Sequence, residues 1–310
     1  MKELIEGTTA YAVFSGDINS KRISHAYMLH FQDAENMREA LKIFALKFFG
    51  VKEGDPVGKR IVNETFPDLR IFPEEGKKLS VESATLLLAD SALKPLEGDR
   101  KLFIISGFND ATPLIQNKLL KTLEEPPEGV YFLLGATTLA PILDTVKSRV
   151  KTLTIPPFSE SEIFRALERK ESNPLNRQAA ESCGGILGVA MNMVSGGWFA
   201  SVSEAAEEIC TTTEIGKVGP VAIKYGDIKY KAELLSAIAL NYHRALKERV
   251  EGRELGTVAA CFETPALIYA LKSVDRAGRD LKFNAFFQGL LFDLMVRIIE
   301  ENDKWLKLRA

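Results

Sequence analysis

The first half of the chain alternates short apolar runs with longer amphipathic patterns. Each run is apolar at most consecutive positions, which is typical of strands buried on both faces of a sheet. Patterns with helical periodicity, at 34–50 and 80–96, separate several of the runs. This alternation predicts βαβ units and therefore an α/β fold with a doubly wound parallel sheet. The predicted strands are HAYMLHF (25–31), DLRIF (68–72), KLFIIS (101–106), VYFLLGA (130–136) and VKTLTI (150–155).

The second half of the chain begins after Pro156 and Pro157 and has helical patterns without a convincing strand. A glycine-rich stretch, VSGGW (194–198), indicates a further boundary. We therefore predict three domains: a sheet domain at 1–156, a small helical domain at 157–198 and a larger helical domain at 199–310. The predicted helices of the second half are 159–171, 173–183, 231–252, 263–279 and 283–299.

The stretch LLKTLEEPPEGVYFLLGATT (119–138) combines a helix, a double proline and an apolar strand. Pro126 disfavours helical geometry for Glu125, so the helix is expected to end there. Taken alone, this pattern predicts only a helix stop within a βα fold.

The last predicted helix, 283–299, is apolar around much of its circumference, so it must be covered on nearly all sides. The centre of a helical bundle and a subunit interface are both open as explanations. Asp293 and Arg297 interrupt the segment, which argues against a membrane span. Its apolar residues are Phe283, Phe286, Phe287, Leu290, Leu291, Phe292, Leu294 and Met295.

Composition indicates a globular protein without a strong net field. The chain has 310 residues, of which 46% are hydrophobic, and 40 basic against 42 acidic side chains give a formal charge of −2. No bulk attraction to nucleic acid or to an anionic membrane follows. Cys183, Cys210 and Cys261 have no CxxC spacing, which argues against a disulfide framework and a thiolate zinc site. The N-terminal stretch has no secretory signal pattern, so a cytoplasmic location is expected.

The order of several motifs resembles that of the DNA polymerase III clamp-loader family, AAA+ proteins that include the gamma/tau and delta-prime subunits. The resemblance covers about Ile23 to Pro157, and its most specific parts are QNKLLKTLEEPP and the later SRV. More weakly, CGGILGVAM (183–191) resembles the family's lid segment, and DLKFNAFFQGLLFDLM (280–295) resembles its collar helix. The resemblance implies a RecA-like AAA+ sheet domain, a helical lid and an all-helical collar that joins subunits into a ring.

The segment that matches the phosphate-binding loop has lost the required residue types. A P-loop needs glycines for close backbone approach and a lysine for the β- and γ-phosphates. The stretch HFQDAENMRE has Phe31 and Asn36 in place of the glycines and Met37 in place of the lysine. Asp33 and Glu35 would also repel phosphate, so this chain is not expected to bind nucleotide there.

Other parts of the ATP machinery are also missing. The strand at 101–106 ends in Ser106 and Gly107, where active relatives have an Asp-Glu pair for Mg²⁺ and water. Asp110 precedes Thr112 and Pro113, the expected N-cap and first residue of a helix, so helix capping is favoured over metal binding.

The lid segment and the cysteine pattern give no replacement for this machinery. The lid segment at 186–189 has no arginine, and Thr137 falls at the family's sensor 1 position. The family's four-cysteine zinc module is absent from 48–66, and His25, His30 and His243 form no substitute. No cofactor and no metal are therefore expected.

One catalytic motif remains. TVKSRV (145–150) matches the family's Ser-Arg-Cys motif, with Ser148, Arg149 and a valine, Val150, in the cysteine position. In the family this arginine reaches the γ-phosphate of ATP bound to a neighbouring subunit, and such arginine fingers accelerate GTP hydrolysis by about 10³ to 10⁵. Without the motif, Arg149 would be taken as an ordinary surface arginine.

A dismantled nucleotide site with a retained arginine finger implies a delta-prime-like stator subunit of the clamp loader. It would not hydrolyse ATP, would lend Arg149 to a neighbour, and would support sliding-clamp loading in DNA replication. The implied partners are gamma/tau-type and delta-type subunits in a hetero-oligomeric ring, with the sliding clamp and primer-template DNA reached through the complex.

Three alternatives remain open. A divergent active ATPase would need a glycine-rich turn, and VGKR (57–60) lacks both the first glycine and the hydroxyl residue. A clamp-loader-derived interaction protein that does not work at the replication fork is compatible with the changed motifs. Direct DNA contact would need a basic patch on one face, and the short basic clusters assign no residue to it. These clusters are Lys147, Arg149 and Lys151; Lys77 and Lys78; and Lys21 and Arg22.

Overall fold

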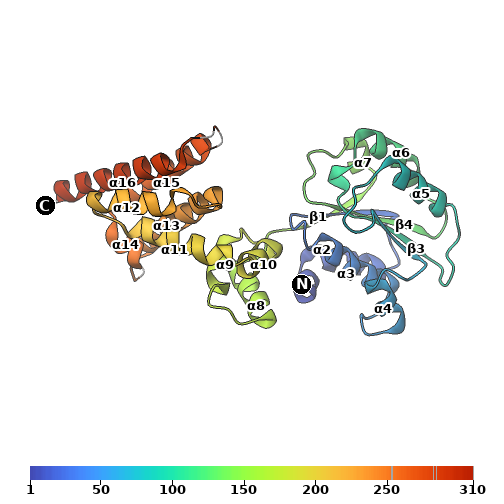
Figure 1. Cartoon of the computed structure of the whole chain (residues 1–310). Coiled ribbons are helices and arrows are strands. Elements are labelled where there is room, and N and C mark those ends of the chain that lie inside the picture. The colour runs from blue at the N-terminus through green and yellow to red at the C-terminus, as the bar shows by residue number, and fades with distance from the viewer. Residues whose placement is uncertain (253, 282, 284, 310) are drawn as a thin grey trace. The chain divides into compact units, whose positions relative to one another are not determined.

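The computed structural model describes residues 1–252, 254–281, 283 and 285–309 (Figure 1). The chain forms two compact units, Met1–Met191 and Asn192–Ala310, and each is described by itself. The boundary falls inside helix α10 (Leu187–Ser195). The division into three domains at 1–156, 157–198 and 199–310 stays a prediction.

The first unit is built on a sheet of five parallel strands in the order β2-β3-β4-β1-β5. β1 lies between β4 and β5, with Ala26 opposite Phe132 and Tyr27 opposite Lys151. The three central strands are almost wholly buried, as the uninterrupted apolar runs predict. The strands are β1 (Ala26–Phe31), β2 (Leu69–Phe72), β3 (Lys101–Ile105), β4 (Val130–Ala136) and β5 (Lys151–Ile155).

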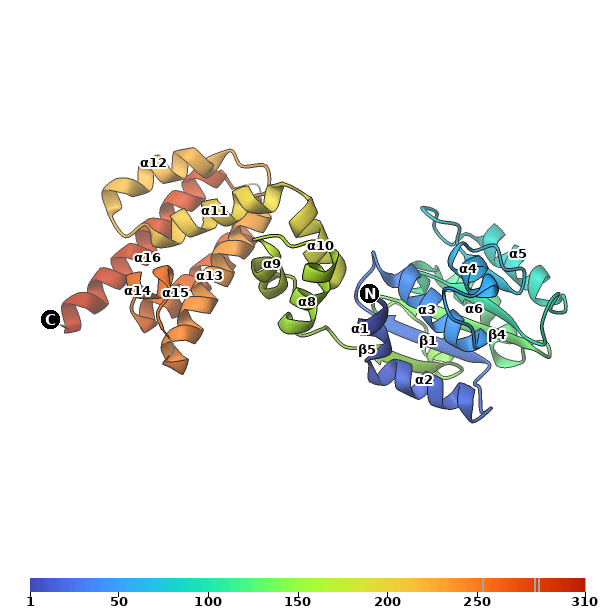
Figure 2. The same ribbon diagram turned by 90° about the horizontal axis from the view of Figure 1, so that it is seen from below.

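Helices cover both faces of this sheet, which confirms the doubly wound α/β fold class. In Figure 1, α2, α3 and α4 lie on one face and α5, α6 and α7 on the other, and Figure 2 places the first group in front of the sheet. The α6 face packs through a core that includes Phe103, Phe132 and Leu119. The helices of this unit are α1 (Lys2–Glu6), α2 (Thr9–Asn19), α3 (Met37–Phe49), α4 (Pro56–Val62), α5 (Val81–Ser91), α6 (Pro113–Glu124), α7 (Asp144–Lys147), α8 (Glu160–Lys170), α9 (Asn176–Ser182) and α10.

The hinge after α6 has the predicted structure. Thr112 caps the helix by accepting a hydrogen bond from the backbone N–H of Ile115, and Pro113 is its first residue. The helix ends at Glu124, and Glu125 has left helical geometry, with φ −130° and ψ 74°. Because Pro126 follows, the helix cannot continue, and the chain enters β4 at Val130.

The second unit is a bundle of helices, as Figures 1 and 2 show. Its core includes Tyr242, Phe262 and Leu291. The helical prediction for this half of the chain is confirmed. The helices are α11 (Trp198–Thr211), α12 (Ile215–Gly226), α13 (Lys231–Glu251), α14 (Thr257–Cys261), α15 (Thr264–Leu281) and α16 (Phe287–Arg309).

Helix α16 begins with a buried phenylalanine, and the phenylalanines just before it are exposed. Phe287 is only 2% exposed, whereas Phe283 is 85% and Phe286 73% exposed. The helix starts at Phe287, later than the predicted start at Phe283, and the predicted collar segment includes Lys282 and Asn284, which lie outside the described residues. Within the described part of the chain, no helix is both long and apolar enough to cross a membrane.

Candidate functional site

The loop after β1 is organised around the carboxylate of Asp33, which is 1% exposed. Its Oδ1 accepts a hydrogen bond from the backbone N–H of Asn36 at 3.1 Å, and its Oδ2 accepts one from Nδ2 of Asn36 at 2.8 Å. Oδ2 also accepts the backbone N–H of Gly188 at 2.8 Å. The carboxylate therefore lies at the N-terminal ends of both α3 and α10, where helix dipoles stabilise negative charge.

Gly188, the second residue of α10, allows this close approach because it has no side chain. A Cβ at this position would lie 2.5 Å from Oδ1 of Asp33 and 3.1 Å from the Cβ of Glu35. Nearby, Gly185 has φ +77° and its carbonyl accepts the N–H of Phe158 at 2.9 Å. Gly188 and Gly185 thus allow tight packing against the loop after β1 and the segment after β5, respectively.

The residue in the P-loop lysine position also contributes to the core. Met37 is the first residue of α3 and is buried. Its Sδ is so close to β4 that a Cβ on Gly135 would lie 2.8 Å from it. The side chain of Met37 is therefore an apolar contact between α3 and the sheet.

At the carboxyl end of β3, hydrogen bonds fix the backbone at Ser106 and beyond it. The N–H of Ser106 donates to the carbonyl of Phe72 at 2.8 Å. The side chain of Asn109 accepts the N–H of Thr137 at 3.0 Å, which joins the segment after β3 to the end of β4. The sensor 1 position thus contributes its backbone to the structure of this edge.

Asp110 is held by its neighbour. Its Oδ1 accepts a hydrogen bond from Nδ2 of Asn109 at 2.9 Å, and the predicted N-cap role belongs to Thr112. Across the residues that the structure describes, no three His, Cys, Asp or Glu side chains group as a metal site.

Arg149 follows α7 and is held by residues of its own chain. Its Nε donates to Oε2 of Glu124 at 3.0 Å, and its Nη1 donates to the carbonyl of Thr145 at 2.9 Å and more weakly to Oγ of Ser148 at 3.3 Å. Its Nη2 makes no hydrogen bond to any residue that the structure describes. The Arg149 side chain is 31% exposed. The guanidinium therefore has one nitrogen available for an external oxygen atom.

Gln116 fixes the segment that carries Arg149. This buried side chain donates from Nε2 to the carbonyls of Ala111 and Pro141 at 2.9 and 3.0 Å, and its Oε1 accepts the N–H of Leu143 at 2.9 Å. Leu143 is the N-cap of α7, so the side-chain amide of Gln116 connects α6 to the start of α7. No pattern in the chain indicates this role, because a glutamine within an amphipathic helix is usually a surface residue.

The apolar side chains around the Ser-Arg motif point into the core of the sheet domain. Val146 and Val150 are both buried in the cluster beneath α6 and α7. The small apolar side chain of Val150 therefore contributes to the core.

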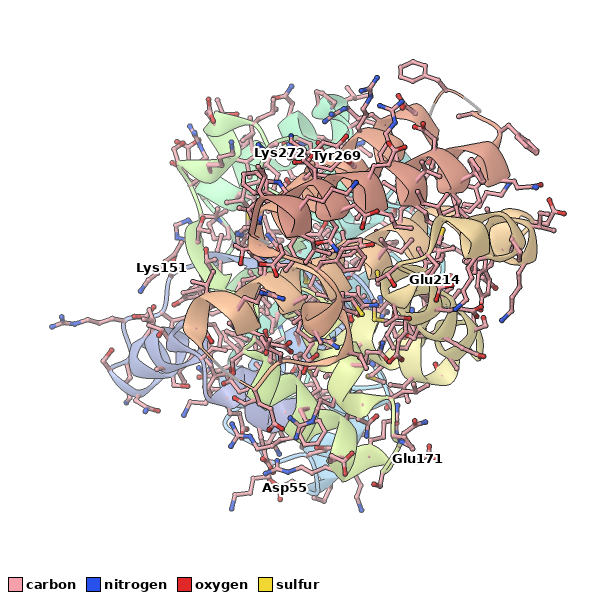
Figure 3. All side chains as sticks on the ribbon, turned by 90° about the vertical axis from the view of Figure 1, so that its left-hand side faces the viewer. Asp55, Lys151, Glu171, Glu214, Tyr269 and Lys272 are labelled. Atoms are coloured by element: carbon pink, nitrogen blue, oxygen red, sulfur yellow. The ribbon has the colours of Figure 1, made fainter. Side chains whose placement is uncertain are left out.

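The basic residues beside Arg149 are each paired with a carboxylate. Lys147 contacts Asp144 at 3.1 Å, and Lys151, labelled in Figure 3, contacts Asp17 at 2.5 Å. Burial raises the pKa of Asp17, but hydrogen bonds from Lys151 and Tyr27 outweigh this effect and lower it overall. These pairings leave no concentrated positive charge on this stretch.

The match to a known protein family lies in the first unit. Residues 7–159 match the family model described as DNA polymerase III, delta subunit. The chain is 29% identical over 163 residues to the DNA polymerase III subunit delta' of Bacillus subtilis, which covers 51% of this chain and 50% of the relative. It is 29% identical over 157 residues to subunit tau/gamma of Haemophilus influenzae, covering 48% of this chain and 23% of that relative. The match thus spans half or less of these relatives' length.

A solved structure resembles the chain over most of its length. It is a DNA polymerase III gamma subunit-related protein from Thermotoga maritima, with 15% identity and a TM-score of 0.44, covering 94% of this chain and 99% of that one.

Proposed function

We propose that this chain, whose residues 7–159 match the family model described as DNA polymerase III, delta subunit, is a clamp-loader protein that acts as a delta-prime-like stator subunit. In this role it is a cytoplasmic accessory subunit of the polymerase holoenzyme that does not itself hydrolyse ATP. It supports sliding-clamp loading during DNA replication and supplies Arg149 to the ATP site of a neighbouring subunit.

The buried carboxylate in the loop after β1 supports the proposal that this chain does not hydrolyse ATP. A buried carboxylate, Asp33, already satisfies the amides that face it at the start of α3 and α10. Phosphate groups brought to these amides would meet a negative charge at close range, which is strongly unfavourable in a site with little water. Met37 offers no cation to offset that charge.

The observation that carries the proposal is the available nitrogen of Arg149, in a chain whose loop after β1 contains the buried carboxylate of Asp33. Its segment is fixed by Gln116 and by the buried Val146 and Val150. A prepositioned guanidinium stabilises the charge that develops on a transferring phosphoryl group without reorganisation at the moment of reaction. Ser148 contributes as the motif neighbour that accepts from Nη1.

The second unit supports assembly into a ring. Phe283, Phe286 and Phe292 of the predicted collar segment are exposed, and exposed aromatic residues are enriched at protein interfaces. We therefore assign this segment to contacts with gamma/tau-type and delta-type subunits. The sliding clamp and primer-template DNA are reached through the assembled complex.

The decisive experiment measures clamp- and DNA-stimulated ATP turnover by a complex reconstituted with gamma-type and delta-type partners. We compare the wild-type chain with Arg149→Ala and with the matched control Lys147→Ala, which removes another basic side chain of the same segment. The proposal expects a clear fall with Arg149→Ala alone, in a complex that gel filtration shows to be intact.

Two results would contradict the proposal. Unchanged turnover by an intact Arg149→Ala complex would leave a purely structural stator. Failure of the wild-type chain to join the complex would favour an interaction protein that works elsewhere. Equilibrium dialysis of the isolated chain with ATP provides a separate test, because the proposal expects no binding.

A further inference from the structure

The carboxylate of Glu124 lies beside the guanidinium of Arg149, although the two residues are 25 positions apart. Oε2 of Glu124 accepts from Nε of Arg149 at 3.0 Å. The Glu124 side chain is 54% exposed, so the pair lies at the surface of the sheet domain. An isolated surface pair of this kind stabilises a fold only slightly. Its main effect is therefore on the orientation of the Arg149 guanidinium.

The contacts of the guanidinium divide its nitrogens into two groups. Nε is directed to Glu124, and Nη1 is directed to the carbonyl of Thr145. Nη2 stays available in the described structure. Because a planar guanidinium has its donors at fixed angles, holding Nε and Nη1 also fixes the direction of Nη2. A phosphate oxygen that approaches Nη2 does not have to displace Glu124.

Both partners of the pair lie at the C-terminal end of a helix, Glu124 as the last residue of α6 and Arg149 just after α7. Glu124 is the last residue of α6, and Pro126 prevents the helix from extending beyond it. Leu123, directly before it, is buried in the core. Gln116 joins α6 to the N-cap of α7, so Glu124 and Arg149 belong to one connected frame.

We propose that Glu124 is a positioning residue that orients Arg149 toward the ATP of the neighbouring subunit, an inference that rests on the proposed function. The Glu-Glu-Pro-Pro hinge then has a specific role. It ends α6 at the position where the carboxylate of Glu124 accepts a hydrogen bond from Nε of Arg149. Orienting the side chain before assembly reduces the conformational freedom that is lost when the neighbouring phosphate is contacted.

The test uses Glu124→Ala and Glu124→Gln in the reconstituted complex. The Arg149-dependent turnover is the part of the ATP turnover that Arg149→Ala removes. Glu124→Ala is expected to lower it about threefold, since a freely rotating arginine is correctly oriented for less of the time. Glu124→Gln retains an oxygen acceptor for Nε and is expected to restore most of that turnover. Glu125→Ala, which removes the adjacent exposed carboxylate, is the matched control and is expected to have no effect.

A double-mutant cycle separates positioning from an unrelated structural effect. If Glu124 acts through Arg149, Glu124→Ala causes no further loss in an Arg149→Ala background. A further loss in that background would overturn the inference. So would wild-type or increased turnover with Glu124→Ala alone, because an increase would mean that the carboxylate competes with phosphate.

The failure of this inference differs from the failure of the proposed function. If Arg149→Ala lowers turnover and Glu124→Ala does not, the arginine finger stands and only the role of Glu124 is overturned. If Arg149→Ala leaves turnover unchanged in an intact complex, both are overturned. Exchange of the Nε proton of Arg149, followed by NMR on the free chain, provides a separate readout: Glu124→Ala is expected to accelerate it and Glu125→Ala is not.

Discussion

The carboxylate of Asp33 accepts a hydrogen bond from the backbone N–H of Gly188, 155 residues further along the chain. It thereby links the loop after β1 to the start of α10, with additional hydrogen bonds from Asn36. A residue that the sequence predicts only as repulsive to phosphate is thus part of the structure that holds the first unit together.

This link predicts that Gly188→Ala is destabilising. The new Cβ would lie 2.5 Å from Oδ1 of Asp33, so the carboxylate or α10 must shift, at a cost of about 1–3 kcal/mol. Hydrogen exchange of the Gly188 region, followed by mass spectrometry, measures the loss locally and does not depend on the second unit. Gly16→Ala in α2 is the control, since nothing lies within 4 Å of its added Cβ, and it is expected to be neutral or stabilising. Equal protection in both variants would contradict the prediction.

Gln116→Ala is expected to loosen the segment that carries Arg149. The substitution removes one buried hydrogen bond, to the carbonyl of Ala111, and two partly buried ones, to the carbonyl of Pro141 and the N–H of Leu143, which together cost about 1–3 kcal/mol. Chemical denaturation measures the loss of stability.

Hydrogen exchange at 141–149 shows where the effect of Gln116→Ala lies. The matched control is Lys121→Ala, which changes an exposed side chain of the same helix and is expected to leave this exchange unchanged. Identical exchange at 141–149 in the two variants would contradict the role of Gln116.

Adjacent phenylalanines at the start of α16 are expected to respond differently to alanine. Phe287 is buried in the bundle, so Phe287→Ala should cost about 3–5 kcal/mol of stability. Phe286 is mostly exposed, so Phe286→Ala should change stability by less than about 0.5 kcal/mol. If this segment contacts the partner subunits, Phe286→Ala weakens assembly of the complex, which analytical ultracentrifugation measures. An assembly as strong as that of the wild type would count against its assignment to the interface.

The ion pairs of Glu64 predict a loss of stability in acid. Hydrogen bonds from Arg38 are the main cause that lowers the pKa of Glu64 below its usual value, with a further contribution from Lys42. A lowered folded-state pKa adds stability above the unfolded value near 4.5, and this stability is lost as the pH falls through the folded value. Glu64→Gln should therefore be less stable than wild type by about 0.5–1 kcal/mol at pH 7, allowing for solvent screening.

Denaturant titrations from about pH 7 to about pH 3 measure this difference. The stability gap between wild type and Glu64→Gln is expected to narrow below about pH 4.5, as the carboxylate becomes protonated. Glu74→Gln is the control, because Glu74 is a fully exposed partner of Lys77 and its pair is screened by water. A gap that stays constant over this range would show that the effect of the substitution is not electrostatic.

Local signals in the sequence are sufficient to predict the strands of the sheet and the hinge after α6. The apolar runs predict all five strands to within a residue at their ends, and Thr112, Pro113 and Pro126 fix the bounds of α6. Helix α2 is not predicted, because the stretch around Tyr11 and Val13 mixes β-branched and aromatic residues without a clear helical period.

The sequence does not predict which residues far apart in the chain contact one another. The motif resemblance indicates Arg149 as the candidate residue, but its contact with Glu124 depends on how α6 and α7 meet in the fold. The hydrogen bonds of Gln116 likewise join residues up to 27 positions apart. In each case a single residue type has many possible partners, and tertiary packing selects one.

The internal carboxylate at the start of α3 and α10 also has a thermodynamic consequence. A protein stabilised by a bound ligand becomes more stable in proportion to the logarithm of ligand concentration, once that concentration exceeds the dissociation constant. Asp33 supplies its negative charge from within the chain, so its presence does not depend on any concentration. We therefore expect the melting temperature of the first unit to be independent of added nucleotide, as it would be for a part of the chain whose conformation does not depend on a ligand.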